Sequence, residues 1–220
     1  MTGAYERELR DVLAGVEKGV EKVIKTCTPE EKERMRSVVN KPFLVVRAAG
    51  SGMEGSGDLV ALRGDCSFPI EVKTRKVKKL YFAGRTKEQL NAMILEAERT
   101  GLMPLYAHRL KGVRGDSWRI FRVETKGLRG VLKALEQRIP ALPQTRTGSP
   151  FIDWDQGMPL NKFIALMCSC PTKEPKSMER LQGRTASTEH EPTPSASDAM
   201  EDVLAELRAR QSKDLTASLM

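Results

Sequence analysis

Cysteine and histidine are scarce in this chain, with only 4 Cys and 2 His among 220 residues. The cysteines are too few and too scattered for a disulfide framework, and Cys168-Ser169-Cys170 does not have the spacing of a common zinc pair. His108 lies in an apolar stretch, where we expect a core or surface residue rather than a ligand. We therefore expect a reduced, intracellular protein and place it in the cytoplasm.

The sequence also lacks a run of apolar residues long enough to cross a membrane, and it shows no N-terminal signal peptide. Aromatic residues make up only 5% of the chain. No series of them accompanies its basic segments, so base stacking on single-stranded nucleic acid is not indicated. We expect no membrane contact.

Positive charge, by contrast, is in excess: 37 Lys and Arg stand against 29 Asp and Glu, a formal charge of +8. Residues 140–220 carry a net charge of −2, so residues 1–139 carry +10. A basic globular part is the electrostatic footprint of a protein that binds phosphate backbones. The alternative is plain solubility, because many small domains carry several net charges.

Two apolar runs separated by a turn contain the most informative residues. Asp58 opens the run 58–61, and Gly64-Asp65 predicts a turn that folds it against residues 70–73. Side chains alternate between the two faces of a strand, so Glu71 and Lys73 point the same way and their apolar neighbours point into a core.

Two carboxylates and an amine on paired strands have the equipment to hydrolyse a phosphodiester. Mg²⁺ takes oxygen ligands and is usually bound by one or two carboxylates together with substrate phosphate. A nearby lysine can orient the attacking water or stabilise charge that develops on the phosphate. The alternative for Glu71 and Lys73 is an exposed strand face with a Glu–Lys pair, which is common on half-buried sheets.

The glycine-rich stretch before Asp58 raises a second alternative. Gly50, Gly52 and Gly55 fit G-x-G-x-x-G, the loop that cradles dinucleotides. That motif needs a helix directly after the loop, whereas here it lies between residues 43–47 and the run that begins at Asp58, which both read as strands. A strand-to-strand loop that folds onto a DNA backbone is favoured instead.

A basic run follows the strand that contains Glu71. Such a run is most often a solvated loop, but beside a metal site it favours contact with DNA arms. Its members are Lys73, Arg75, Lys76, Lys78, Lys79 and, a few residues on, Arg85.

Five motifs in order, over about residues 4–124, resemble the archaeal Holliday-junction resolvases, a branch of the restriction-endonuclease-like nucleases. The motifs are Glu6-Arg7-Glu8-Leu9, residues 45–52, Asp58-Leu59-Val60-Ala61, Ile70-Glu71-Val72-Lys73 and Leu80-Tyr81. The resemblance implies an endonuclease that binds four-way DNA junctions as a homodimer. It would make paired symmetric nicks with Mg²⁺, or with Mn²⁺ as a substitute, in DNA recombination and repair.

The resemblance also assigns roles. Glu6, Asp58 and Glu71 would be metal ligands, with Glu8 as the alternative to Glu6. Lys73 would be the catalytic lysine, acting with Asp58, Glu71 and the loop residue Ser51. The DNA-binding residues, from the resemblance and from the basic run, would be Arg7, Arg47, Arg75, Lys76, Lys78, Lys79, Arg85 and Gln89.

The periodicity predicts a mixed α/β sheet flanked by helices. Apolar residues from Leu9 to Ile24 indicate one amphipathic helix, and Thr28-Pro29-Glu30-Glu31 indicates a capped second one. Further helices are expected at 86–100 and 127–139, and further strands at 104–110 and 118–123. The nuclease domain would span residues 1–139, and residues 19–41 would be a helical insertion that compact family members lack.

Residues 140–220 read as a largely disordered extension, because 8 of the 12 prolines fall between Pro140 and Pro194. Two apolar islands, 151–154 and 160–167, would pack on the core or dock on a partner. Residues 198–211 would form a short helix on contact with another protein. Two alternative functions stay open: a restriction- or repair-type endonuclease acting on flaps or linear duplex, and a non-catalytic DNA-binding module.

Overall fold

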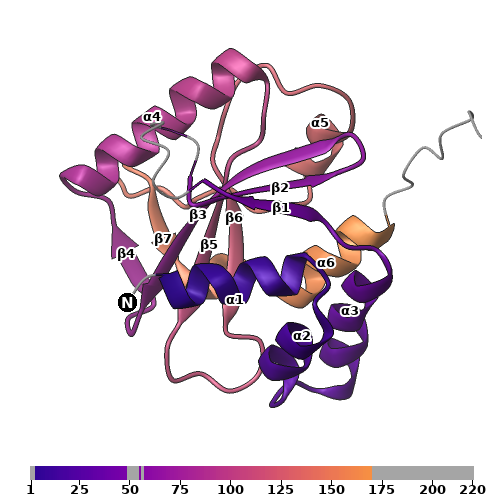
Figure 1. The fold of residues 1–220 in the computed structure, drawn as a ribbon. Coiled ribbons are helices and arrows are strands. Elements are labelled where there is room, and N and C mark those ends of the chain that lie inside the picture. Colours follow the sequence, from indigo (N-terminus) through magenta and orange to yellow (C-terminus); the bar gives the residue numbers. More distant parts are fainter. Residues whose placement is uncertain (1–2, 49–54, 56, 170–220) are drawn as a thin grey trace, which may run out of the picture. The chain divides into compact units, whose positions relative to one another are not determined.

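The computed structural model describes residues 3–48, 55 and 57–169, which form an α/β fold built on a six-stranded mixed sheet (Figure 1). Its strands lie in the order β1 (Leu44–Arg47), β2 (Leu59–Arg63), β3 (Cys66–Arg75), β5 (Leu105–Leu110), β6 (Trp118–Arg122) and β8 (Met158–Pro159). A two-stranded sheet pairs β4 (Lys79–Tyr81) with β7 (Phe151–Asp153). The predicted mixed sheet flanked by helices is confirmed.

The β2–β3 hairpin follows from its turn and its alternation. Gly64 has a φ of +53°, a backbone conformation that glycine adopts without strain, and Arg63 pairs with Cys66 across the turn. Strands β3 and β5 are parallel, so the chain must cross over between them. It does so through β4 and α4 (Arg85–Thr100), which ends at Gly101 in the left-handed conformation.

The N-terminal region differs from the expected single helix between Leu9 and Ile24. The chain forms α1 (Gly3–Leu13) and α2 (Glu17–Ile24), with a turn between them at Gly15, whose φ is +67°. A Cβ at Gly15 would lie 2.8 Å from the Val38 carbonyl oxygen, so the turn is packed tightly against the next helix. The continuous apolar stripe hides this break, because it passes from one helix to the other.

The predicted cap of the following helix is confirmed. In α3 (Pro29–Asn40) the Glu31 amide donates to Thr28 Oγ1 at 3.3 Å, and the Thr28 amide donates to Glu31 Oε2 at 3.0 Å. This reciprocal pair satisfies two amides that a helix start otherwise leaves without partners.

The sheet has an apolar layer on each face. The larger layer buries side chains from α1, α2, α3 and α5 (Gly130–Glu136) against β2, β3, β5 and β6. The smaller layer lies under α4, where Leu90 and Met93 pack with Tyr106 and Phe121 of the sheet. Glu71 and Lys73 belong to this second face, because their neighbours Ile70 and Val72 are buried in the first layer.

The compact part continues past residue 139, where the sequence placed the end of the nuclease domain. Contacts group residues 140–169 with the preceding chain, and α6 (Leu160–Ser169) buries Phe163 and Ile164 in the larger core. The Asn161 amide and side chain both donate to the buried Asp116 carboxylate at 2.8 Å. The apolar islands thus pack on the core, and their surrounding prolines occupy connections and the short strand β8.

The helix expected at 198–211 lies outside the described residues, as do all residues from 170 to 220. Within the described part of the chain, no helix combines the length and apolarity needed to cross a membrane.

Candidate functional site

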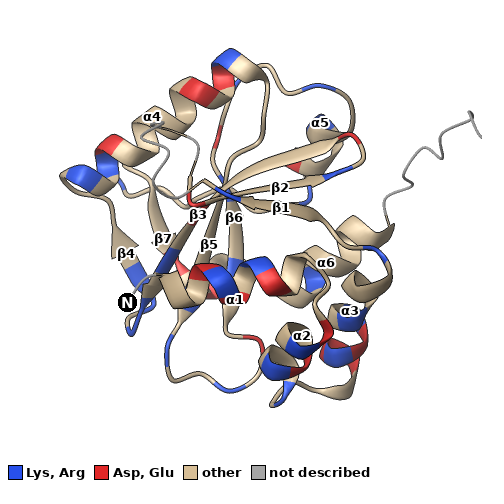
Figure 2. Ribbon diagram, viewed as in Figure 1, with Lys and Arg blue, Asp and Glu red and all other residues tan. Residues whose placement is uncertain are grey.

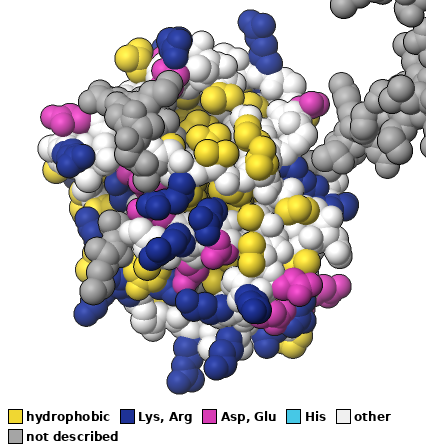
Figure 3. Space-filling model, in the orientation of Figure 1, with side chains coloured by type: hydrophobic (Ala, Val, Ile, Leu, Met, Phe, Trp, Pro, Cys, Tyr) yellow, Lys and Arg dark blue, Asp and Glu magenta, His cyan; other side chains and the backbone are white. Residues whose placement is uncertain are grey.

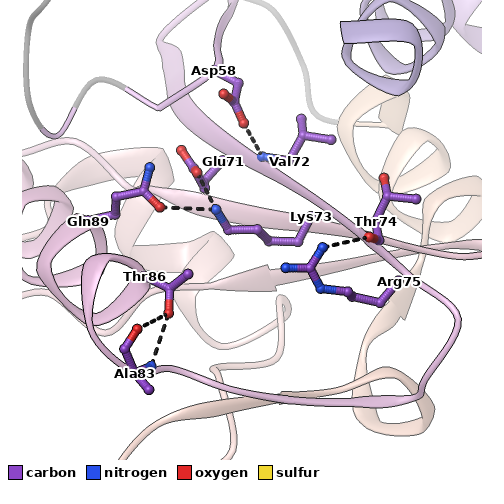
Figure 4. A network of polar contacts seen from close by, with 9 residues as sticks. All are labelled: Asp58, Glu71, Val72, Lys73, Thr74, Arg75, Ala83, Thr86 and Gln89. Carbon is purple, nitrogen blue, oxygen red and sulfur yellow. Dashed lines mark hydrogen bonds and ion pairs between the residues drawn. The ribbon is translucent and has the colours of Figure 1, made fainter. Parts of the chain in front are cut away.

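Asp58, Glu71, Lys73 and Gln89 converge beside the start of α4 (Figure 4). Asp58 lies directly before β2, Glu71 and Lys73 lie on β3, and Gln89 lies in the second turn of α4. The alternation of β3 places Glu71 and Lys73 on one face, as predicted, and this face is covered by α4. The site is therefore formed where the hairpin and the crossover helix meet.

Lys73 is held by two oxygen acceptors. Its Nζ donates to Glu71 Oε1 at 2.6 Å and to Gln89 Oε1 at 3.1 Å. Glu71 is only 5% exposed, so the alternative of a solvated Glu–Lys pair on a strand surface does not describe it. A lysine ammonium has three N–H donors, and these two bonds leave one for a ligand.

Asp58 is bound to the backbone of the neighbouring strand. The Val72 amide donates to Asp58 Oδ2 at 2.8 Å, and the Asp58 amide donates to the Ile70 carbonyl at 2.9 Å. Gly57 makes this approach possible: its φ is +72°, and a Cβ there would lie 2.7 Å from the Ile70 carbonyl oxygen. Glycine before Asp58 is thus a steric requirement of the site.

The environment raises the pKa of Asp58 to about 6. Burial is the main cause, and the negative charge of Glu71 adds to it, whereas the Val72 amide bond acts in the opposite direction. Glu71 is therefore close enough to Asp58 for its charge to disfavour ionisation of Asp58. A cation placed between them would relieve this repulsion.

These donors fit a hard divalent cation. Carboxylate oxygens suit Mg²⁺ and Mn²⁺, and Mg²⁺ usually keeps several waters besides one or two carboxylates. No group of three or more His, Cys, Asp or Glu residues in the described part of the chain is placed to hold a metal. Asp58 and Glu71 would accordingly supply two ligands, with water and substrate phosphate completing the shell.

Glu6, predicted as the third ligand, is buried and forms an ion pair with Arg47 at 2.8 Å. Its charge contributes to the raised pKa of Asp58, but the structure does not gather it into a three-carboxylate group. Glu8, the alternative, accepts from Arg109 at 2.7 Å and from Trp118 Nε1 at 3.1 Å. Those bonds tie Glu8 to β5 and β6.

The predicted DNA-binding residues lie on several elements. Arg75, Lys76, Lys78, Lys79 and Arg85 are exposed on the segment from the end of β3 to the start of α4. Arg7 is exposed on α1 and lines a pocket with Asp11 and Lys22. Lys and Arg residues recur along these elements in Figure 2, and Figure 3 shows them clustered across the centre of this face. Ser51 lies outside the described residues.

Two polar residues of this region were not foreseen as part of the site. Tyr106 pairs with Glu71 in the parallel register, and His108 pairs with Lys73. Both are fully buried, and neither the Tyr106 hydroxyl nor the His108 ring has a hydrogen-bond partner among the described residues. Burial, together with the charges of Glu71 and Asp58, raises the pKa of Tyr106. Their spacing in the sequence could have indicated this position, because Tyr106 and His108 are two residues apart, as are Glu71 and Lys73 on the neighbouring strand.

The described residues thus form a mixed sheet flanked by helices, with two carboxylates and a lysine at its central hairpin. Residues 25–130 match the model of the family described as archaeal Holliday junction resolvase (Hjc). The match includes Asp58, Glu71, Lys73 and Gln89, and it begins after Glu6 and Arg7. The resemblance predicted from the motifs is confirmed.

Among solved structures, the chain is similar to Hjc of Archaeoglobus fulgidus, a Holliday junction resolvase from an archaeal hyperthermophile. The identity is 22%, with 61% of this chain and 96% of that chain covered and a TM-score of 0.40. No curated protein matches the chain.

Proposed function

We propose that this protein is a divalent-metal-dependent endonuclease that binds four-way DNA junctions and resolves them by paired symmetric nicks in recombination and repair. The observation that supports this best is the group of Asp58, Glu71 and Lys73, of which Glu71 is buried and the other two are partly buried, within a segment that matches the resolvase family. A protein that only bound DNA would have no need to gather two carboxylates and a lysine in a site largely shielded from water.

Asp58 and Glu71 would hold Mg²⁺, or Mn²⁺ in its place. When bound, the metal would polarise a phosphoryl oxygen and lower the pKa of a water that it coordinates. Asp58 keeps one oxygen on the Val72 amide, so its other oxygen is the one available to a cation. Because its pKa is about 6, Asp58 is mostly ionised at neutral pH and can act as a ligand there.

Lys73 would act on the phosphate itself. Glu71 and Gln89 fix the position of the Lys73 ammonium, so its remaining N–H donor is already oriented before the substrate binds. Little side-chain entropy is then lost on substrate binding. That donor can stabilise the charge that develops on a non-bridging oxygen as the bond breaks. Gln89 would thus position Lys73, and Ser51 would assist from the loop before Asp58.

The flanking basic residues would contact the DNA backbone. Phosphate contacts position a protein on a duplex without reading its sequence, which suits recognition of a branched shape. We assign this role to Arg7, Arg47, Arg75, Lys76, Lys78, Lys79, Arg85 and Gln89. We place this action in the cytoplasm, where cysteines stay reduced.

Cutting two opposed strands requires two sites related by symmetry, so we infer a homodimer. An apolar sheet face favours this arrangement: Leu44 and Val46 on the edge strand β1 are 66% and 50% exposed. They pair in register with Leu62 and Val60 of β2, which makes the exposed patch continuous. Figure 3 shows hydrophobic side chains gathered over this part of the molecule.

The test is cleavage of a synthetic four-way junction, compared with linear duplex and flaps of the same sequence, with Mg²⁺ and with EDTA. We expect metal-dependent nicking of the junction in preference to the other substrates. Asp58→Ala and Glu71→Ala should each reduce nicking at least 100-fold and leave junction affinity within a few fold. Full cleavage by either variant would refute the site, and equal rates on all substrates would favour a duplex or flap nuclease.

A further inference from the structure

Residues 153–155 lie against two lysines of the basic run. The pairing of β4 with β7 sets this contact, and the Trp154 amide donates to the Lys78 carbonyl at 2.9 Å. Lys78 Nζ is 3.0 Å from both carboxylate oxygens of Asp155, and Lys79 Nζ is 3.7 Å from Asp153 Oδ2. Two of the side chains proposed to contact DNA are therefore already paired with carboxylates.

The two carboxylates differ in how easily they could release a lysine. Asp153 is buried, and its oxygens also accept from the Asp155 amide and from the Gln156 side chain. Asp155 has no such anchor among the described residues. The side chains of Asp155 and Lys78 are 55% and 57% exposed, so water screens the pair. Exposed ion pairs are weak, and this one can exchange its partner without disturbing the fold.

We propose that Asp155 is an internal stand-in for a DNA phosphate, which occupies Lys78 in the free protein and lowers the affinity for DNA that contacts this lysine. Both oxygens of Asp155 contact the ammonium, as phosphate oxygens would. This inference rests on the proposed function, because it assumes that Lys78 meets a DNA backbone.

The effect follows from competition for the same amine. A DNA phosphate must displace Asp155 before it gains Lys78, so the net gain from this lysine is small. The displacement costs the same free energy in every complex that engages Lys78, so the carboxylate lowers the affinity for any DNA that makes this contact.

The experiment compares Asp155→Asn with Asp65→Asn, which makes the same change of charge. Asp65 is exposed at the β2–β3 turn, the opposite end of the hairpin from Asp58 and Glu71. Binding of the full chain to a four-way junction and to linear duplex is measured without metal over a range of salt concentrations. Melting temperatures within a few degrees of wild type show that both variants fold.

We expect Asp155→Asn to tighten binding of each DNA that engages Lys78 by about 2- to 5-fold. The salt slope for duplex should steepen by roughly 0.9, the value of one added phosphate contact. Asp65→Asn should change neither. In a Lys78→Ala background, Asp155→Asn should have no further effect, because the competing amine is gone.

An equal gain from Asp155→Asn with and without Lys78, or a gain no larger than that of Asp65→Asn, would overturn the inference. So would unchanged salt slopes in a protein that still binds and nicks junctions, and that result would leave the proposed function intact. A wild-type chain that binds neither DNA would overturn both.

Discussion

Replacing Asp58 by asparagine should make the metal-free protein more stable at pH 8, although the change removes a metal ligand. Asparagine has nearly the same shape, and its carbonyl oxygen can accept the Val72 amide bond that Asp58 accepts now. What it cannot do is carry the charge that burial and Glu71 disfavour. A functional carboxylate is thus expected to cost stability.

The size of the effect follows from the pKa. Asp58 has a pKa of about 6 in the folded protein, against an ordinary value of 3.8. A difference of roughly 2 units, at about 1.4 kcal/mol per unit, sets an upper limit of about 3 kcal/mol for the gain. Partial exposure and screening reduce it, so we expect a gain of about 1–3 kcal/mol in the free energy of unfolding.

The sign of the pH dependence is fixed by the same shift. Because the folded pKa is raised, protonated Asp58 contributes stability that is complete below pH 4 and is lost as the pH rises through 6. Asp58→Asn has no carboxyl group to ionise at this position, so it does not lose this stability as the pH rises. The stability difference between the two proteins should therefore be small at pH 4, grow between pH 4 and pH 7, and stay constant above.

Urea denaturation in EDTA at several pH values measures this difference, and every other titrating group cancels between the two proteins. Addition of Mg²⁺ should stabilise the wild type and leave Asp58→Asn nearly unchanged, because only the wild type has both carboxylates. A variant less stable than wild type at pH 8, or a difference that does not vary with pH, would refute the account of Asp58.

Three further outcomes are expected. Burial lowers the pKa of His108 to about 4, so the folded protein favours the neutral ring and loses stability as the pH falls from 6.5 towards 4. In urea denaturation, the free energy of unfolding of His108→Leu should therefore fall less over this range than that of the wild type, by up to about 3 kcal/mol. Gly57→Ala should destabilise by about 1–3 kcal/mol and nearly abolish nicking, since its Cβ would lie 2.7 Å from the Ile70 carbonyl oxygen; unimpaired cleavage would contradict this. Leu44→Glu should shift the mass measured by light scattering from dimer to monomer and uncouple the paired nicks, and an unchanged mass would move the dimer interface elsewhere.

Local signals in the sequence were enough for most of the elements and for part of the site. The alternation of residues 70–73 placed Glu71 and Lys73 on one face, and the Thr28 cap marked the start of α3, because both depend on residues only a few positions apart. The break at Gly15 was missed, since an apolar stripe of helical period continues through it.

Contacts between distant segments were decided by the tertiary structure alone. Composition separates residues 140–169 from the domain, yet α6 completes the larger core and Asp155 meets Lys78 across 77 positions of sequence. Likewise, the pKa of Asp58 depends on how deeply the hairpin is buried and on how close Glu71 comes. Residue types and their spacing determined which groups this protein has for phosphate chemistry. Their partners and their charges follow from packing, because burial and pairing depend on neighbours that lie far away along the chain.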